Sequence, residues 1–308
     1  MDIYIYFPKR FFTEEQLNKF KGHNLYFSSI KNTELSDNKR FFQKDPFILA
    51  VDPTYLKGVW EALPAEKLKK MTGLKALCLT TTSYSWINGK ELAKSGAILT
   101  NTPNKCTEAV AEFAVYMMFS LLRKLPLIVK NKWEMDYDNF PNEETTGLTA
   151  GILGLGKIGK RIAEVCKAMG MKVVYWNRSK KEAPFEPLDI DSFFGKTDVV
   201  FNTLATSPEL RGFINKKLIS KLKPSSLIIS TSDTHIFDEP FILEQVEKGK
   251  LGGFAFESFP KKISHYKGNV MVFPEQAYFT TGALKNTARI VTETILSILK
   301  GTPINVVN

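Results

Sequence analysis

Three glycines near the middle of the chain have the spacing of a loop that binds phosphate. They are Gly154, Gly156 and Gly159, in the run Gly-Leu-Gly-Lys-Ile-Gly. In such a loop the first glycine permits a tight turn, the second lets backbone N–H groups approach a pyrophosphate, and the third lets a helix pack closely on a strand. The N-terminus of that helix offers unpaired N–H groups to the anion. We therefore predict a dinucleotide-binding loop across these six residues, which include Lys157 and Ile158.

The sequence on both sides of the glycines predicts the elements that such a loop needs. Residues 148–153 form an apolar run typical of a buried strand, and residues 173–176 form another. Between them apolar residues recur with the spacing of one helix face, up to Gly170, which can cap the helix. Glycines alone could serve only a turn, but a strand, loop, helix and second strand in this order favour phosphate binding.

The residues after the second strand bear on which dinucleotide binds. NAD-binding proteins place an Asp or Glu there, which accepts hydrogen bonds from the ribose 2′-OH. This chain has Asn177, Arg178 and Ser179 instead. A guanidinium can pair with a 2′-phosphate and a hydroxyl can donate to it, whereas a carboxylate would repel it. We predict NADP(H) as the cofactor; the alternative is an NAD(H) binder that lacks the carboxylate and has a plain polar turn here.

The rest of the chain continues the alternation of strands and helices. Further strands are predicted at residues 3–7, 47–51, 76–80, 97–100, 199–202, 226–230 and 254–256. Further helices are predicted from Thr107 until Pro126, at residues 216–222, after Asp238 and at residues 284–299. This order predicts an α/β fold with doubly wound parallel sheets. A chain of 308 residues is long enough to form two hydrophobic cores. The pattern predicts two lobes that are connected near residues 100 and 284.

Composition and charge limit the classes of function. The net charge is +10, but the lysines are scattered in short groups, which favours a solvated surface over a nucleic-acid site. No apolar run reaches 18 residues without charge, and the N-terminus has a strand pattern, so we expect neither a membrane span nor a signal peptide. Cys78, Cys106 and Cys166 lie far apart, which predicts no metal site and favours a reducing cytoplasm.

The chain resembles the D-2-hydroxyacid dehydrogenases, a family that includes glyoxylate, hydroxypyruvate and phosphoglycerate dehydrogenases. The resemblance spans nearly the whole length, and its motifs are Asn101-Thr102-Pro103, Thr107 to Glu112, Gly151 to Gly159, Ser207 to Gly212 and Ile304 to Asn308. It implies two Rossmann-like domains: a discontinuous substrate domain, residues 1–100 plus 284–308, and a central NADP-binding domain, residues 101–283. It also implies a cleft for a small-molecule substrate between them and a homodimer.

The resemblance implies catalytic residues from which this sequence departs. The family uses an Arg to hold the substrate carboxylate, a His as the acid and a Glu that supports the His. Asp233 stands in the place of the Arg, and Glu275 in the place of the His. Residues 257–263 show no clear counterpart of the family's Glu-Pro, and Ser83 matches the glycine of the substrate loop.

Four residues at or near these positions are candidates for catalysis. His235 follows Asp233 by two residues and could be a relocated acid, since an imidazole exchanges protons near neutral pH and the aspartate could orient it. Its alternative is a solvated loop histidine. Glu275 could serve as an acid if it is desolvated. Tyr84 is a further donor, for which packing or a surface position is the alternative.

Two functions are compatible with these residues. The first is an NADP(H)-dependent oxidoreductase of the D-2-hydroxyacid dehydrogenase type with an atypical active site. Asp233 and Glu275 would repel the carboxylate of a simple 2-keto acid, so a neutral or cationic carbonyl or imine suits better. The second is a catalytically silent dinucleotide-binding protein, in which cofactor occupancy regulates lobe closure or a partner.

Overall fold

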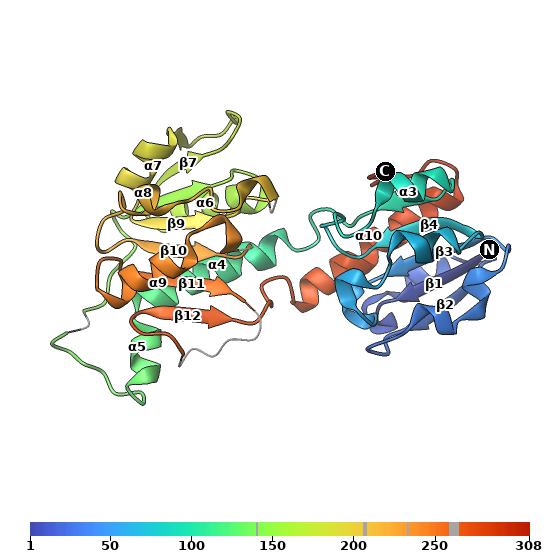
Figure 1. Cartoon of the computed structure of the whole chain (residues 1–308), viewed down its shortest axis with the longest axis horizontal. Helices are drawn as coiled ribbons and strands as arrows, with labels where there is room; N and C mark the ends of the chain where they lie inside the picture. Colours follow the sequence, from blue (N-terminus) through green and yellow to red (C-terminus); the bar gives the residue numbers. More distant parts are fainter. Residues whose placement is uncertain (140, 206–207, 233, 259–264) are drawn as a thin grey trace. The chain divides into compact units, whose positions relative to one another are not determined.

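The computed structural model describes residues 1–139, 141–205, 208–232, 234–258 and 265–308 (Figure 1). The chain divides into two compact units. The first comprises Met1–Cys106 and Thr281–Asn308, and the second comprises Thr107–Thr280. Each unit contains a sheet whose neighbouring strands are parallel, flanked by helices. This confirms the predicted α/β class with two Rossmann-like sheets.

The first unit contains a five-stranded sheet in the order β2-β1-β3-β4-β5. Its strands are β1 (Asp2–Tyr6), β2 (Asn24–Ser28), β3 (Phe47–Val51), β4 (Leu74–Leu79) and β5 (Ile98–Thr100). Its helices are α1 (Glu14–Asn18), α2 (Ala65–Lys69), α3 (Gly89–Lys94) and α10 (Thr281–Leu299). Alternate residues of β1 enter different cores: Ile3 packs in the cluster that includes α10, and Tyr4 in the cluster that includes α2 and α3. Both faces of this sheet are therefore covered.

The second unit contains a seven-stranded sheet in the order β12-β11-β10-β9-β6-β7-β8. Its strands are β6 (Thr149–Leu153), β7 (Lys172–Trp176), β8 (Glu186–Pro187), β9 (Val199–Asn202), β10 (Leu227–Ser230), β11 (Gly253–Glu257) and β12 (Val270–Phe273). Its helices are α4 (Thr107–Leu122), α5 (Leu125–Lys130), α6 (Lys157–Ala168), α7 (Ile190–Lys196), α8 (Lys216–Ile219) and α9 (Glu239–Glu247).

The helices of the second unit cover opposite faces of its sheet. Ile152 packs in the cluster that includes α4 and α6, whereas Leu153 packs in the cluster that includes α7, α8 and α9. Strand β6 lies between β7 and β9, so the order of strands along the chain reverses beside it. In doubly wound sheets ligands bind outside the carboxyl ends of the strands at such a reversal. The strand order therefore indicates the carboxyl end of β6 as the place for a ligand.

The structure adds elements that the alternation did not predict. Strand β12 is only four residues long, and its pairing with β11 defines it. Pro126 lies in the first turn of α5 rather than simply beyond a helix, because proline has no N–H to lose at that position. Lys124 separates α4 from α5 with a φ of 54°.

Across the described ranges, every helix is too short or too polar to cross a bilayer.

Candidate functional site

The loop after β6 has the geometry that its glycines predict. Gly154 has a φ of 92°, and its N–H donates to the carbonyl of Trp176 at 2.9 Å. A Cβ at Gly159 would lie 2.2 Å from the carbonyl oxygen of Gly154, so a side chain there would force helix and loop apart. These two glycines are therefore required by the fold of the loop.

Gly156 differs from its two neighbours in the motif. It precedes α6 as the N-cap residue, with no side chain of the described residues capping the helix. A Cβ at Gly156 would meet no described atom within 4 Å. Lys157 is exposed, and Ile158 packs against the core of the unit. The space beside Gly156 thus leaves the N–H groups in the first turn of α6 accessible to an anion, as binding of a pyrophosphate would require.

Two polar residues that the sequence did not predict lie beside this loop: Thr203, which binds the loop itself, and Asn202, which ends β9 and binds the segment around the end of β10. The hydroxyl of Thr203 donates to the carbonyl oxygen of Gly154 at 2.6 Å. The amide of the buried Asn202 donates to the hydroxyls of Ser230 and Ser232, at 3.0 and 2.8 Å. The only signal in the sequence is a polar pair directly after an apolar strand.

The residues predicted to select the cofactor follow β7, beside the loop. Arg178 and Ser179 are exposed. The side chain of Asn177 turns back toward the protein, and its Oδ1 accepts a hydrogen bond from the N–H of Leu155 at 3.1 Å. The structure therefore brings the predicted loop and the predicted turn together at one edge of the sheet.

The candidate catalytic residues are more dispersed. His235 is exposed in a 3-10 helix (Thr234–Ile236) after β10, and Glu275 is exposed after β12. Both residues follow the carboxyl ends of parallel strands. In the sheet order β10 lies two places from β6 and β12 lies four places from it. At ~4.8 Å between neighbouring strands, these two strands are about 10 and 20 Å from β6. Tyr84 belongs to the other unit and is 44% exposed. Asp233 lies outside the described residues.

Glu257 is a third residue of the site region that the sequence did not predict. It ends β11, and its Oε1 accepts the N–H groups of Gln276 and Ala277 at 2.6 and 2.7 Å. Burial raises the pKa of the Glu257 carboxyl, the two N–H donors act in the opposite direction, and the charge of Glu275 raises it further. Glu257 therefore fixes the turn that carries Glu275.

This contact gives a prediction about stability. Glu257→Ala leaves two N–H groups without their acceptor and should lower the free energy of unfolding by about 1–2 kcal/mol. The pKa of Glu257 is raised in the folded protein. The stability that this carboxyl contributes is therefore fully present below its pKa in the unfolded chain, and it is lost as the pH rises through its pKa in the folded protein. Glu257→Gln keeps an acceptor without the charge, so its stability relative to wild type should increase from pH 4 to pH 7. Thermal unfolding of all three proteins measures both effects, and a constant difference across this pH range would contradict the second.

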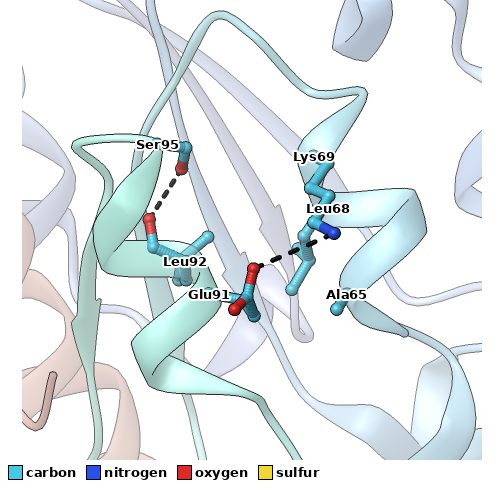
Figure 2. A pocket seen from close by; sticks show the side chains of 6 residues that line it. All are labelled: Ala65, Leu68, Lys69, Glu91, Leu92 and Ser95. Carbon is cyan, nitrogen blue, oxygen red and sulfur yellow. Dashed lines mark hydrogen bonds and ion pairs between the residues drawn. The ribbon is translucent and has the colours of Figure 1, made fainter.

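Two hollows of very different size lie in the two units. Figure 2 shows one between α2 and α3, where Lys69 faces Glu91 at 3.8 Å; its volume of about 10 Å³ suits at most a water. The other, of about 320 Å³, lies in the second unit between α4 and the turn that Glu257 holds. Tyr116 and Phe279 contribute exposed rings to it. Among the described residues no group of His, Cys, Asp and Glu could hold a metal ion.

The glycine loop, the parallel strand order and the two units define a protein of the dinucleotide-binding α/β class. The sequence model described as "D-isomer specific 2-hydroxyacid dehydrogenase, NAD binding domain" matches residues 115–277, more than half of the chain. The chain belongs to the D-isomer specific 2-hydroxyacid dehydrogenase family.

Individual relatives agree with this family. A D-3-phosphoglycerate dehydrogenase from Synechocystis is 32% identical over 224 residues, which cover 68% of this chain and 40% of that protein. A glyoxylate reductase from Thermococcus litoralis is 24% identical over 81% of this chain and 82% of its own length. The chain spans about 40–49% of the phosphoglycerate dehydrogenases it matches.

Solved structures share the whole fold. An acyclic imino acid reductase in complex with NADPH and D-Arg has a TM-score of 0.83 at 23% identity, and the match covers 100% of both chains. A D-2-hydroxyisocaproate dehydrogenase has a TM-score of 0.81 at 21% identity, over 100% of this chain and 99% of that one.

Proposed function

We propose that this chain binds a nicotinamide dinucleotide on the loop from Gly154 to Gly159, with NADP(H) preferred to NAD(H). The observation that carries the proposal is the open first turn of α6 at Gly156, at the point where the strand order reverses. Backbone N–H groups at a helix N-terminus favour a pyrophosphate there. The NAD binding domain named in the family description supports the same assignment.

The preference for NADP(H) rests on the turn after β7. Arg178 and Ser179 are exposed directly after the strand, where a 2′-phosphate would lie in a dinucleotide fold. Lys180 adds a nearby positive charge, and Asn177 stands where an NAD-binding protein has a carboxylate. In the solved acyclic imino acid reductase the cofactor is NADPH.

Calorimetry with both cofactors tests this preference. We expect NADPH to bind more tightly than NADH by about 1.5–3 kcal/mol, the scale of hydrogen bonds to a charged group. Arg178→Ala should reduce this difference between the binding free energies of NADPH and NADH. Lys172→Ala, at the opposite end of β7, is the matched control and should leave it unchanged. Equal affinities, or tighter binding of NADH, would overturn the assignment.

We further propose that the protein is a reductase or dehydrogenase with an atypical active site. Residues 101–283 would bind the cofactor and residues 1–100 plus 284–308 the substrate. The nicotinamide supplies or accepts the hydride. Asp233 and Glu275 at the matched positions favour a neutral or cationic carbonyl or imine over a 2-keto acid. His235 and Tyr84 are the candidate proton donors, and the name of the imino acid reductase with the same fold supports an imine.

The alternative function is a dinucleotide-binding protein without catalysis. It is favoured by the exposure of Glu275 and His235, since a proton donor normally works in a desolvated site. Turnover of any carbonyl or imine with NADPH would exclude it. In either case we propose the homodimer that the family implies, which sedimentation at several concentrations would test.

A further inference from the structure

The side chain of Asn177 connects the two segments that the proposed cofactor site requires. Its Oδ1 accepts the N–H of Leu155, inside the glycine loop, at 3.1 Å. Its Nδ2 donates to the carbonyl oxygen of Ser179 at 2.7 Å and lies 3.4 Å from the hydroxyl of the same residue. One amide group therefore holds the phosphate loop on one side and the turn that carries Arg178 on the other.

Few other residue types could make both contacts from this position. An aspartate could accept from Leu155, but an ionised carboxylate has no N–H for the carbonyl of Ser179. An alanine could make neither bond. Leu155 is buried, so its N–H has little access to water as a substitute partner. The amide of Asn177 is thus matched to one donor and one acceptor of the backbone.

The connection bears on the placement of the guanidinium. Arg178 is exposed, and its side chain forms no hydrogen bond or ion pair with other described residues, so it gives the turn no anchor of its own. The bond from Asn177 to Ser179 spans Arg178 and fixes the backbone on both sides of it. A backbone fixed before binding reduces the ordering that a ligand must impose.

We propose that Asn177 is a positioning residue that couples the glycine loop to the Arg178 turn and thereby sets the preference for a dinucleotide with a 2′-phosphate. This inference rests on the proposed function. Asn177 does not contact the phosphate in this scheme. It acts through Arg178, and its amide is engaged by the backbone rather than by the ribose.

A double-mutant cycle on the cofactor-free full chain tests the coupling. The dissociation constants of NADPH and NADH are measured for wild type, Asn177→Ala, Arg178→Ala and the double variant. We expect Asn177→Ala to reduce the preference for NADPH by about fivefold to tenfold, the effect of one to two lost hydrogen bonds. In the Arg178→Ala background the same substitution should leave the preference unchanged. Asn215→Ala, which removes an asparagine that caps α8, is the control and should change neither affinity.

The outcomes separate this inference from the proposed function. Three outcomes would overturn the coupling alone. They are an unchanged NADPH preference in Asn177→Ala, an equal loss of affinity for both cofactors, and an effect of Asn177→Ala that persists in the Arg178→Ala background. Failure of the wild type to bind either dinucleotide would overturn both. If Asn177→Ala does not fold, the neutral variant Asn177→Ser, whose shorter side chain cannot make both contacts, is measured instead, and we expect it to lose about fivefold to tenfold in NADPH affinity relative to NADH. Unchanged NADPH affinity in that variant would contradict the inference.

Discussion

Gly156→Val is expected to abolish dinucleotide binding and leave the protein folded. A Cβ at this position meets no described atom within 4 Å, and the backbone has a φ of −80° and a ψ of −166°, which a valine adopts without strain. Its methyl groups would fill the space through which the helix N–H groups approach a pyrophosphate. Loss of two hydrogen bonds to a charged ligand corresponds to about 3–6 kcal/mol, or a factor of ~10² to 10⁴ in affinity.

Two further glycine substitutions distinguish this effect from misfolding. Gly195→Val adds the same side chain in α7, where a Cβ likewise meets no described atom within 4 Å, and it should bind NADPH as wild type does. Gly159→Val places a Cβ against the carbonyl of Gly154 and should lower the unfolding temperature sharply. Calorimetry with NADPH and thermal unfolding supply both readouts. Normal affinity in the folded Gly156→Val protein would mean that the phosphate loop is wrongly assigned.

The second large effect concerns the substrate, and we expect negligible NADPH-dependent reduction of glyoxylate, hydroxypyruvate or pyruvate. Hydride transfer to a 2-keto acid needs a cation for the carboxylate and a proton donor for the developing alkoxide. The match that we propose places Asp233 and Glu275 where the family has its Arg and His. Removal of a transition-state charge partner commonly costs a factor of ~10² to 10³ in rate, and the opposite charge should cost more.

Steady-state assays near neutral pH with saturating NADPH test this expectation. The glyoxylate reductase of Thermococcus litoralis, assayed in parallel, controls for the quality of the glyoxylate. Turnover at rates normal for dehydrogenases would show that the residues are wrongly matched or that His235 has taken the acid role. In the latter case His235→Ala should remove the activity, whereas Asp233→Ala should not. If the acids are inert, a screen of neutral aldehydes, ketones and imines separates the reductase from the silent binding protein.

The elements around the phosphate loop could be predicted from local sequence. Strands at residues 173–176 and 199–202 were predicted, and the structure has Lys172–Trp176 and Val199–Asn202. Strands buried on both faces are apolar along their whole length, so they stand out from the amphipathic helices between them. Strand β2 was not predicted, because it is half exposed and its residues lack such a run.

The contacts that hold the candidate site were decided by the tertiary structure. Asn177 binds a residue 22 positions away, Thr203 one 49 positions away and Glu257 one 20 positions away. Each of these bonds joins the ends of neighbouring strands: β7 with β6, β9 with β6, and β11 with β12. The sequence by itself determined the glycine loop and the absence of a carboxylate after the second strand, and it is the source of the proposal that the catalytic positions are replaced. It could not determine these partners, because periodicity reports which side of an element is buried and carries no information on which strands become neighbours.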